Sequence, residues 1–295
     1  MYSKFKQPKV IAEIGCNHMG NIDIAIDMIS VAKTFCKVDV VKFQKRDIDF
    51  WAKVKPEIYN SPHPNPMHSY GDTYLEHRKA LEFDIEQHKI LKDYCDSIGI
   101  EYSCSVWDVK SAMEIASLNP NIIKVPSAAN NNYELLEWLC DNFMGEIHVS
   151  TGMTGKSEIE DIVNFFIKKR RNDSLVIYHC ISGYPVAFKD TYLLEIDRLV
   201  QKYGTVVKDI GYSGHHLGIA IDIAAYTLGA NVIERHFTLD RTWKGTDHAA
   251  SLEPDGLRKL KRDLMATYEA LKYKDVDLLE FEVIQKEKLK FKDNK

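Results

Sequence analysis

Short apolar segments alternate with amphipathic segments along almost the whole chain, and this alternation constrains the fold more than any other feature. Eight apolar runs have the continuous character of strands buried on both faces: residues 9–14, 38–43, 99–105, 122–126, 146–150, 174–180, 206–212 and 231–237. Helical periodicity fills the intervals at residues 22–35, 85–97, 109–116, 133–141, 159–169, 191–203 and 219–228. These units predict the α/β class and a single-domain (β/α)8 TIM barrel.

A doubly wound open sheet is the alternative arrangement of alternating strands and helices. Such a sheet usually carries a G-x-G-x-x-G turn after its first strand. Here the first strand is followed by GCNHMG, from Gly15 to Gly20, which does not have that spacing. The closed barrel is therefore the favoured prediction.

The barrel is expected to occupy residues 1–275, with a closing helix over 254–271. Residues 276–295 are expected to form a C-terminal tail whose Lys-rich end, 286–295, is frayed. Between the second strand and the helix at 85, we expect residues 47–82 to form an extended loop. Because this loop leaves the C-terminal end of a strand, where barrel active sites form, it should lie over the site.

Composition excludes several classes of function. Lys and Arg (39) are outnumbered by Asp and Glu (43), so the net charge of −4 does not favour nucleic acid as a partner. No run approaches the length of a membrane span, and the N-terminus has no apolar signal-peptide core, so no membrane association is expected. The six cysteines are scattered without a C-x-x-C pair, which indicates reduced thiols and a cytoplasmic location.

Reactive side chains follow the predicted strands at their C-terminal ends, where a barrel forms its active site. In chain order they are Glu13, Lys42, Gln44, Ser103, Ser105, Lys124, Ser127, Ser150, Ser182, Tyr184, Ser213, His215, Glu234, His236 and Asp247. Because strand side chains alternate, Lys42 and Gln44 share one face, as do Glu234 and His236. Arg235 then points outward, and we expect it to form an ion pair with a surrounding helix.

Two pairs among these residues indicate ligands. Lys42 and Lys124, if they converge, imply a bound anion of at least two charges, because a buried ammonium group must be compensated. The alternative is that nearby acids pair with both lysines. His215 and His236, on neighbouring strands, could hold a divalent metal and leave positions open for substrate and water. Packing or supporting roles are expected for His18, His179 and His216.

Seven segments together resemble the sialic acid (nonulosonate) synthase family. They are IAEIGCNHMG from Ile11, VKFQK from Val41, KVPS from Lys124, VSTGM from Val149, SGYP from Ser182, GYSGH from Gly211 and IERHFTLD from Ile233. Two more, YGDTYLEHR from Tyr70 and WKGTDHAASLEP from Trp243, are similar to the animal and related bacterial members in particular. The resemblance covers roughly residues 8–270, in the same order.

This resemblance implies a reaction and its participants. The family condenses phosphoenolpyruvate with an open-chain aldose, N-acetylmannosamine or its 6-phosphate, to give a 2-keto-3-deoxy sugar acid and phosphate. It implies a divalent metal, Mn²⁺ or Mg²⁺, with Co²⁺ or Zn²⁺ as further candidates. A (β/α)8 barrel is the implied fold, in agreement with the periodicity.

The resemblance also implies a role for each matching residue. His215 and His236 would bind the metal. Phosphoenolpyruvate would be bound by Lys42, Ser105, Lys124, Ser127, Ser150, Ser182 and Ser213. The sugar would contact Gln44, Tyr184 and Asp247. The catalytic residues would be Glu13, near the metal-bound water, with Lys42, Lys124, Glu234 and Asp247.

This sequence departs from the family pattern at two points. Many members have an acidic residue in a Ser-Gly-(Glu/Asp) sequence after the fourth strand, where this chain has Ala129. Either another group replaces it, the aldehyde differs, or turnover has lapsed. Many members also append an antifreeze-like domain that reaches the partner's site in a dimer, and we expect this chain to lack it. A homodimer remains an expectation, and residues 47–82 would close the sugar side, with His77 and Arg78 contacting phosphate or hydroxyl groups.

Three other functions remain open. A related phosphoenolpyruvate aldolase could make an eight-carbon or a deaminated nine-carbon ulosonate. A barrel that has lost catalysis could bind sugar alone, although the retained lysines and histidines argue against this. A metal hydrolase would usually need more protein ligands, such as an H-x-H pair on the first strand, which this chain lacks.

Overall fold

Eight parallel strands close into a barrel in the computed structural model, which describes residues 5–291. The strands are β1 Lys9–Gly15, β2 Val40–Lys45, β3 Glu101–Val106, β4 Ile122–Val125, β5 Glu146–Ser150, β6 Leu175–Cys180, β7 Asp209–Gly214 and β8 Val232–His236. Neighbours in sequence pair throughout, and β1 closes the barrel against β8, with Lys9 opposite Val232. The predicted (β/α)8 architecture is confirmed.

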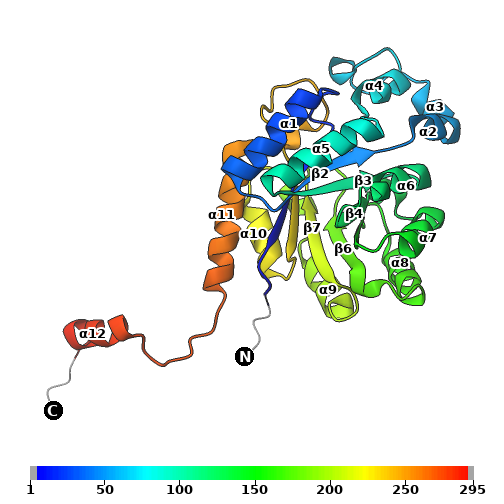
Figure 1. Cartoon of the computed structure of the whole chain (residues 1–295). Helices are drawn as coiled ribbons and strands as arrows, with labels where there is room; N and C mark the ends of the chain where they lie inside the picture. The colour runs from blue at the N-terminus through cyan, green and yellow to red at the C-terminus, as the bar shows by residue number, and fades with distance from the viewer. Residues whose placement is uncertain (1–4, 292–295) are drawn as a thin grey trace.

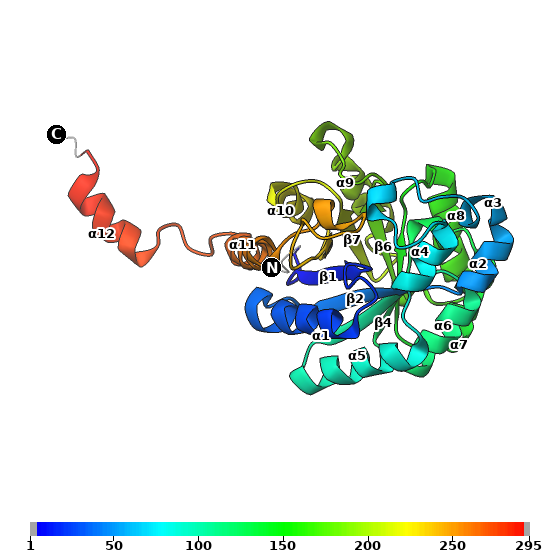
Figure 2. The ribbon, with the colours of Figure 1, turned by 90° about the horizontal axis from the view of Figure 1, so that it is seen from above.

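Helices surround this barrel as a ring (Figures 1 and 2). They are α1 Ile22–Val31, α5 Ile85–Ile98, α6 Val109–Ser117, α7 Tyr133–Asn142, α8 Lys156–Lys168, α9 Leu194–Tyr203, α10 Ala220–Thr227 and α11 Pro254–Ala270. Local sequence sets their ends. The Asn21 side chain caps α1 by accepting from the backbone of Asp23 and Ile24, and Gly99 ends α5 in the left-handed conformation, at φ 69°. All the predicted helices are present, with ends shifted by a few residues.

The inside of the barrel divides into an apolar part and a polar part. A buried cluster inside the barrel contains Ile11, Val40, Ile122, Val176, Tyr178 and Val232. Most of these residues come from the first half of their strands, whereas the polar side chains that line the cavity lie nearer the C-terminal ends. Outward-facing strand residues such as Val41 and Phe43 belong instead to the larger core under the helices. The apolar cluster therefore fills the lower part of the barrel, and the polar side chains that could take part in a reaction lie above it at the C-terminal mouth.

The segment after β2, predicted as an extended βα loop over residues 47–82, is folded into short helices. It contains α2 Ile48–Val54, α3 Pro56–Tyr59 and α4 Tyr74–Leu81. A reciprocal capping box of Thr73 and Glu76 starts α4. These helices lie at the top of the molecule in Figure 1, beyond the C-terminal ends of the strands, which is the predicted location.

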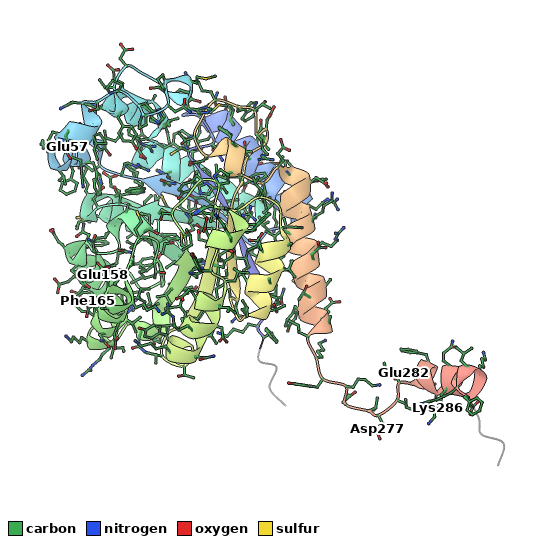
Figure 3. All side chains as sticks on the ribbon, turned by 180° about the vertical axis from the view of Figure 1, so that it is seen from behind. Glu57, Glu158, Phe165, Asp277, Glu282 and Lys286 are labelled. Carbon is green, nitrogen blue, oxygen red and sulfur yellow. The ribbon has the colours of Figure 1, made fainter. Side chains whose placement is uncertain are left out.

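The chain beyond α11 departs from the barrel (Figures 1 and 2). It contains α12 Glu280–Leu289, so the prediction of a frayed end is wrong for residues 286–289, and residues 292–295 lie outside the described part. Figure 3 shows Glu282 and Lys286 of α12 apart from the other helices, and no residue of α12 is buried. Over residues 5–291, none of the helices combines the length and apolar character that crossing a membrane requires.

Candidate active site

A cavity of about 470 Å³ opens at the C-terminal ends of the strands. Nearly every residue predicted for the site lines it: Glu13, Lys42, Gln44, Arg78, Ser105, Lys124, Ser127, Ser150, Ser182, Tyr184, Ser213, His215, Glu234, His236 and Asp247. His77 is not among the lining residues. The volume lies within the range of small-molecule sites and leaves space for two small substrates.

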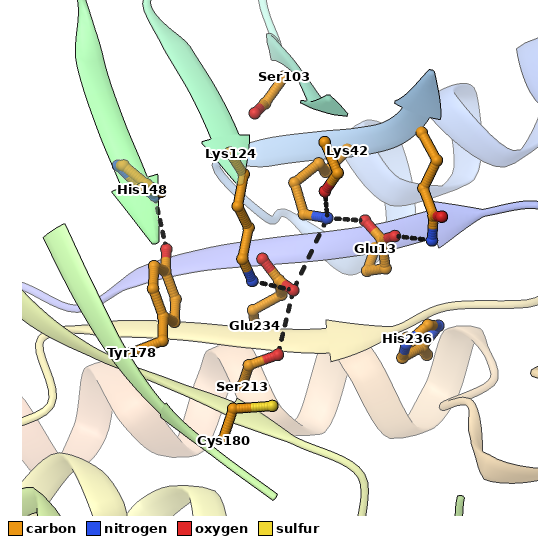
Figure 4. A network of polar contacts seen from close by, with 12 residues as sticks. Glu13, Lys42, Ser103, Lys124, His148, Tyr178, Cys180, Ser213, Glu234 and His236 are labelled. Atoms are coloured by element: carbon orange, nitrogen blue, oxygen red, sulfur yellow. Dashed lines mark hydrogen bonds and ion pairs between the residues drawn. The ribbon is translucent and has the colours of Figure 1, made fainter. Parts of the chain in front are cut away.

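Lys42 and Lys124 converge on this cavity and are also paired with acids, so both alternatives left open by the sequence describe part of the arrangement (Figure 4). Lys42 forms an ion pair with Glu13 and donates to the Ser105 hydroxyl at 2.7 Å. Lys124 donates to Glu234 at 2.6 Å, and Lys42 lies 3.7 Å from the same carboxylate oxygen. Two ammonium groups thus face two carboxylates, and we name these four residues the lysine end of the cavity.

Burial and charge act against each other within the lysine end. Burial lowers the pKa of Lys124, and although Glu234 opposes this, the pKa stays below its ordinary value. Burial alone would raise the pKa of Glu234, but the charges of Lys124 and Lys42 outweigh it and lower that pKa to about 2. Glu234 is therefore ionised at neutral pH, and its charge is met by the two lysines.

Two serine hydroxyls of the cavity lie close to the backbone of Gly152 because this residue has no side chain. A Cβ at Gly152 would lie 2.4 Å from the Ser182 hydroxyl and 2.6 Å from the Ser127 hydroxyl. The Gly152 backbone N–H donates to the Ser127 hydroxyl at 3.0 Å. Hydroxyls and backbone N–H groups of this kind form anion-binding concavities.

His215 and His236 lie side by side, with ring centroids 5.4 Å apart. The His215 Nδ1 bonds the Ile181 carbonyl at 2.9 Å, which orients the ring and leaves Nε2 for a ligand. Burial lowers the pKa of His215 to about 3, and His236 adds to this effect, so His215 is neutral. The Nδ1 of His236 is buried without a hydrogen-bond partner, 4.0 Å from a carboxylate oxygen of Asp247.

These features fit a divalent metal held by two imidazoles. A neutral, oriented His215 and an unpartnered nitrogen on His236 are the donors that such an ion requires. Within residues 5–291 no group of three or more His, Cys, Asp and Glu side chains is placed to hold a metal. A metal held by the two imidazoles would leave its remaining positions to substrate and water, and this stays a prediction.

Beneath the lysine end, a buried chain of polar contacts supports Lys124. Its ammonium group lies 4.3 Å from the ring centroid of Tyr178. The Tyr178 hydroxyl lies 2.6 Å from Nδ1 of His148, and Nε2 of His148 lies 3.1 Å from Glu146. Burial would raise the pKa of Glu146, but His148, Lys9 and Lys208 lower it to about 2. In Figure 4 a dashed line joins His148 to the Tyr178 hydroxyl, and the Tyr178 ring lies beside Lys124.

A second group of charges lines the cavity under α4. Arg46, which directly follows β2, and Arg78 of α4 both contact the same carboxylate oxygen of Glu82. The guanidinium carbon of Arg46 lies 4.0 Å from the ring centroid of Trp107. Arg46 and Trp107 were not predicted from the sequence. Arg46 follows Lys42 and Gln44 at the same two-residue interval, so the alternation along the strand could have predicted that it faces the cavity. We name Arg46, Arg78 and Glu82 the arginine end.

Several other predicted residues have structural contacts. Arg235 forms a buried ion pair with Asp222 of α10, as expected, and bonds the ring of His216 at 3.0 Å. His18 stacks on Phe83 with centroids 3.9 Å apart. His77 packs against other aromatic rings of its segment, with its centroid 4.4 Å from that of His63. Ala129 is buried and does not line the cavity, whereas its neighbour Ala128 does.

A TIM barrel whose mouth combines paired lysines, serine hydroxyls and two imidazoles defines a class of enzyme that handles anionic substrates. Residues 28–275 match the sequence model of the NeuB family, and the chain belongs to this family. It is therefore a synthase of the predicted kind, a phosphoenolpyruvate-dependent transferase that forms a carbon–carbon bond.

Relatives at the sequence level carry several synthase names. The chain is 39% identical over 282 residues to N-acetylneuraminate-9-phosphate synthase of Mus musculus, which covers 95% of this chain and 76% of that protein. It is 34% identical to N,N'-diacetyllegionaminic acid synthase of Campylobacter jejuni, over 86% of this chain and 75% of that one.

Solved structures agree with this placement. The crystal structure of N-acetylneuraminic acid (sialic acid) synthetase from Leptospira borgpetersenii has a TM-score of 0.79 at 28% identity, covering 97% of this chain and 94% of that one. A truncated 3-deoxy-D-arabino-heptulosonate 7-phosphate synthase from Thermotoga maritima shares the fold, with a TM-score of 0.65 at 14% identity over 90% of this chain and 88% of that one.

Proposed function

We propose that the protein condenses phosphoenolpyruvate with an open-chain aldose of the N-acetylmannosamine type, free or 6-phosphorylated, to give a sialic acid-like 2-keto-3-deoxy sugar acid and phosphate. One observation carries this proposal: lysine and serine side chains that can bind an anion line the same cavity as two imidazoles. The names of the animal relatives and of the Leptospira structure support the choice of aldose.

Each step has a residue suited to it. Lys42, Lys124 and the serine hydroxyls hold phosphoenolpyruvate, whose C3 attacks the aldehyde carbon of the sugar. The aldehyde oxygen takes up a proton and becomes a hydroxyl. Positive charge develops at C2 of phosphoenolpyruvate, where the carboxylates of Glu13 and Glu234 stabilise it. Water adds at C2 with Glu13 accepting one of its protons, which balances the proton that the aldehyde oxygen takes up. The C2–O bond to phosphate then breaks, and the new C2 hydroxyl becomes the ketone as its proton passes to the departing phosphate.

A divalent ion bound by His215 and His236 would supply a Lewis acid for the aldehyde oxygen. Mn²⁺ or Mg²⁺ is the proposed ion, with Co²⁺ or Zn²⁺ as further candidates. The six cysteines are all free, which suits the reducing cytoplasm that we propose as the location. The homodimer stays a prediction.

A different product is favoured by one observation. The loop after β4 presents Ala128 to the cavity and buries Ala129, so neither side chain can accept a hydrogen bond from a sugar hydroxyl or amide. An aldose without the N-acyl group, or one with fewer carbons, would need fewer such contacts. The product would then be a deaminated nine-carbon or an eight-carbon ulosonate.

The test is phosphate release from phosphoenolpyruvate by the purified protein. Each assay contains Mn²⁺ or Mg²⁺ and one aldose from a panel of mannosamine, mannose and pentose derivatives, free and phosphorylated. We expect release only when aldose and metal are both present, and mass spectrometry of the product decides between the two candidates. Absence of release with every aldose and every metal would refute both.

A further inference from the structure

The two imidazoles that fit a metal are anchored unequally. His236 belongs to β8, and the pairing of β8 with β1 places it opposite Glu13. His215 follows the end of β7, and the pairing of β7 with β8 stops one residue earlier, at Gly214 opposite Arg235. Strand pairing therefore does not set how far the two rings lie apart. That separation depends on what holds the loop that follows β7 and carries His215.

Arg235 holds this loop from β8. Its Nη2 donates to the His216 carbonyl at 2.6 Å, and its Nη1 donates to the Gly218 carbonyl at 2.8 Å. Nη1 also lies 3.0 Å from Nε2 of the His216 ring. Because a guanidinium group can only donate, this Nε2 accepts and is not free to bind a metal. One side chain thus connects the loop of His215 to the strand residue that precedes His236.

The charge of Arg235 is compensated outside the cavity. Asp222, in the first turn of α10, accepts from Nη1 at 2.5 Å. Arg235 is 1% exposed and Asp222 is fully buried, and neither lines the cavity. A buried ion pair of this kind contributes little net stability compared with apolar side chains of similar volume. What the pair adds is direction, because it orients the guanidinium fork toward the two backbone carbonyls.

Two further features fit a loop that is held in one conformation. The His215 carbonyl accepts from the backbone N–H of Val186 at 3.0 Å, so the segment after β6 bonds the loop from its other side. Gly214 leaves room for the His216 ring, since a Cβ there would lie 2.9 Å from that ring. The ring can therefore fold back onto Arg235. The loop is thus fixed both from β8 and from the segment after β6.

We propose that Arg235 is a positioning residue for the metal. By holding the loop after β7, it sets the separation of His215 and His236 so that both rings bind one divalent ion. This proposal rests on the proposed function, since it concerns the metal of the same reaction. Loss of the fork should weaken metal binding but leave both imidazoles in place. Excess metal should then restore turnover, which it cannot do once an imidazole is removed.

The first experiment measures the binding of Mn²⁺ to the wild type and to Arg235→Lys by calorimetry. Lysine keeps the charge that Asp222 requires but lacks the fork that reaches both carbonyls. We expect the Kd for Mn²⁺ to rise at least about tenfold, the usual cost of losing a residue that orients a metal ligand. Turnover should fall at limiting Mn²⁺ and approach the wild-type value at saturating Mn²⁺.

Arg171→Lys is the matched control. Arg171 also donates to two backbone carbonyls, those of Phe143 at 2.6 Å and Gly145 at 2.9 Å, and it does not line the cavity. This change should lower the temperature of unfolding, as Arg235→Lys does, without changing the Kd for Mn²⁺. The positioning role would be overturned if Arg235→Lys bound Mn²⁺ as tightly as the wild type, if both variants lost affinity equally, or if saturating Mn²⁺ failed to restore turnover.

A second variant covers the case in which Arg235→Lys does not fold. Arg235→Met combined with Asp222→Asn removes both charges together, so neither is left buried and unpaired. The double variant should unfold cooperatively on heating and bind Mn²⁺ at least about tenfold more weakly than the wild type. Wild-type affinity in this variant would contradict the proposal. A wild type that binds no Mn²⁺ and releases no phosphate with any aldose would instead remove the proposed function.

Discussion

The two ends of the cavity handle positive charge in opposite ways. At the lysine end two ammonium groups face the carboxylates of Glu13 and Glu234, and the charges balance before any ligand binds. At the arginine end two guanidinium groups share the single carboxylate of Glu82. Both ends are buried, so solvent does not account for the difference.

This contrast indicates different tasks. An anion that enters the lysine end competes with two carboxylates for the same ammonium groups, so the balance of contacts can change as charge develops on the reacting atoms. Interactions that strengthen only in the transition state raise kcat. The arginine end can contact a ligand before the reaction and hold it unchanged throughout, which lowers KM. The predictions below test this division of tasks.

The largest effect is expected for His236→Ala. Metal-dependent turnover should fall by more than about a thousandfold, because the ring nitrogens that would hold the ion are lost. The fold should be retained, since Nδ1 of His236 has no hydrogen-bond partner to lose. Turnover is measured with saturating metal, binding of Mn²⁺ by calorimetry, and stability by thermal unfolding. Unchanged affinity for Mn²⁺ would show that the ion binds elsewhere.

Lys124→Ala is expected to have the next largest effect. The change removes the nearest cation to the buried Glu234, at 2.6 Å, and half of the charge that faces phosphoenolpyruvate. The value of kcat/KM for phosphoenolpyruvate should fall about a hundredfold, and the KM for the aldose should change little. Lys45→Ala, which removes a buried cation outside the cavity, is the control. If the affinity for both substrates fell equally, the lysine end would not be the binding site for phosphoenolpyruvate.

Alkaline pH should separate the two ends without any mutation. Burial lowers the pKa of Lys124, so this group loses its proton below the ordinary lysine value of 10.5 as pH rises. The KM for phosphoenolpyruvate should therefore increase as pH rises toward 10.5, by up to about tenfold per unit above the pKa of Lys124. The KM for a phosphorylated aldose should stay level, because arginine keeps its proton. A parallel increase of both constants would contradict the separation.

The sequence predicted the lysine end better than the arginine end for a physical reason. Strands of a parallel barrel end at one mouth, so residues such as Lys124 and His236 must meet wherever the strands begin and end within a residue or two. Arg46 lies just beyond its strand, where alternation is no longer guaranteed. Arg78 comes from a helix, on which adjacent residues point in different directions, so the pattern could not choose between His77 and Arg78.

The sequence also could not predict which of these side chains form ion pairs with each other. Whether Lys42 contacts Glu13 depends on the register of β1 against β2, which places these two residues opposite each other. Register in turn depends on how the whole barrel closes. Residues 47–82 were predicted as a long loop because about forty residues, including the Pro-rich run from Tyr59 to Met67, separate the second strand from the helix at 85. Their short helices depend on local caps such as that of Thr73 and on contacts with the rim of the barrel.

The smallest effect on activity is expected from a change in the buried polar contacts that run from Glu146 through Tyr178 to Lys124. Glu146 is ionised and accepts from Nε2–H of His148, so Nδ1 of His148 accepts from the Tyr178 hydroxyl. This bond draws the phenol proton toward the imidazole and enriches the ring beneath the ammonium group of Lys124. Tyr178→Phe keeps the ring but removes the bond. Because a cation–π contact contributes about 0.5–2 kcal/mol, the KM for phosphoenolpyruvate should rise only about threefold.

Tyr102→Phe provides the matched control for that change. Its hydroxyl bonds Nδ1 of His88 at 2.7 Å in an equally buried place, but Tyr102 packs on Phe43 outside the cavity. Both variants should lose about 1 kcal/mol of unfolding free energy in urea, because each loses one buried hydrogen bond. Only Tyr178→Phe should change the KM for phosphoenolpyruvate. If the two variants had the same KM, the chain from Glu146 to Tyr178 would stabilise the barrel without acting on Lys124, and the balance of the lysine end would depend on its carboxylates alone.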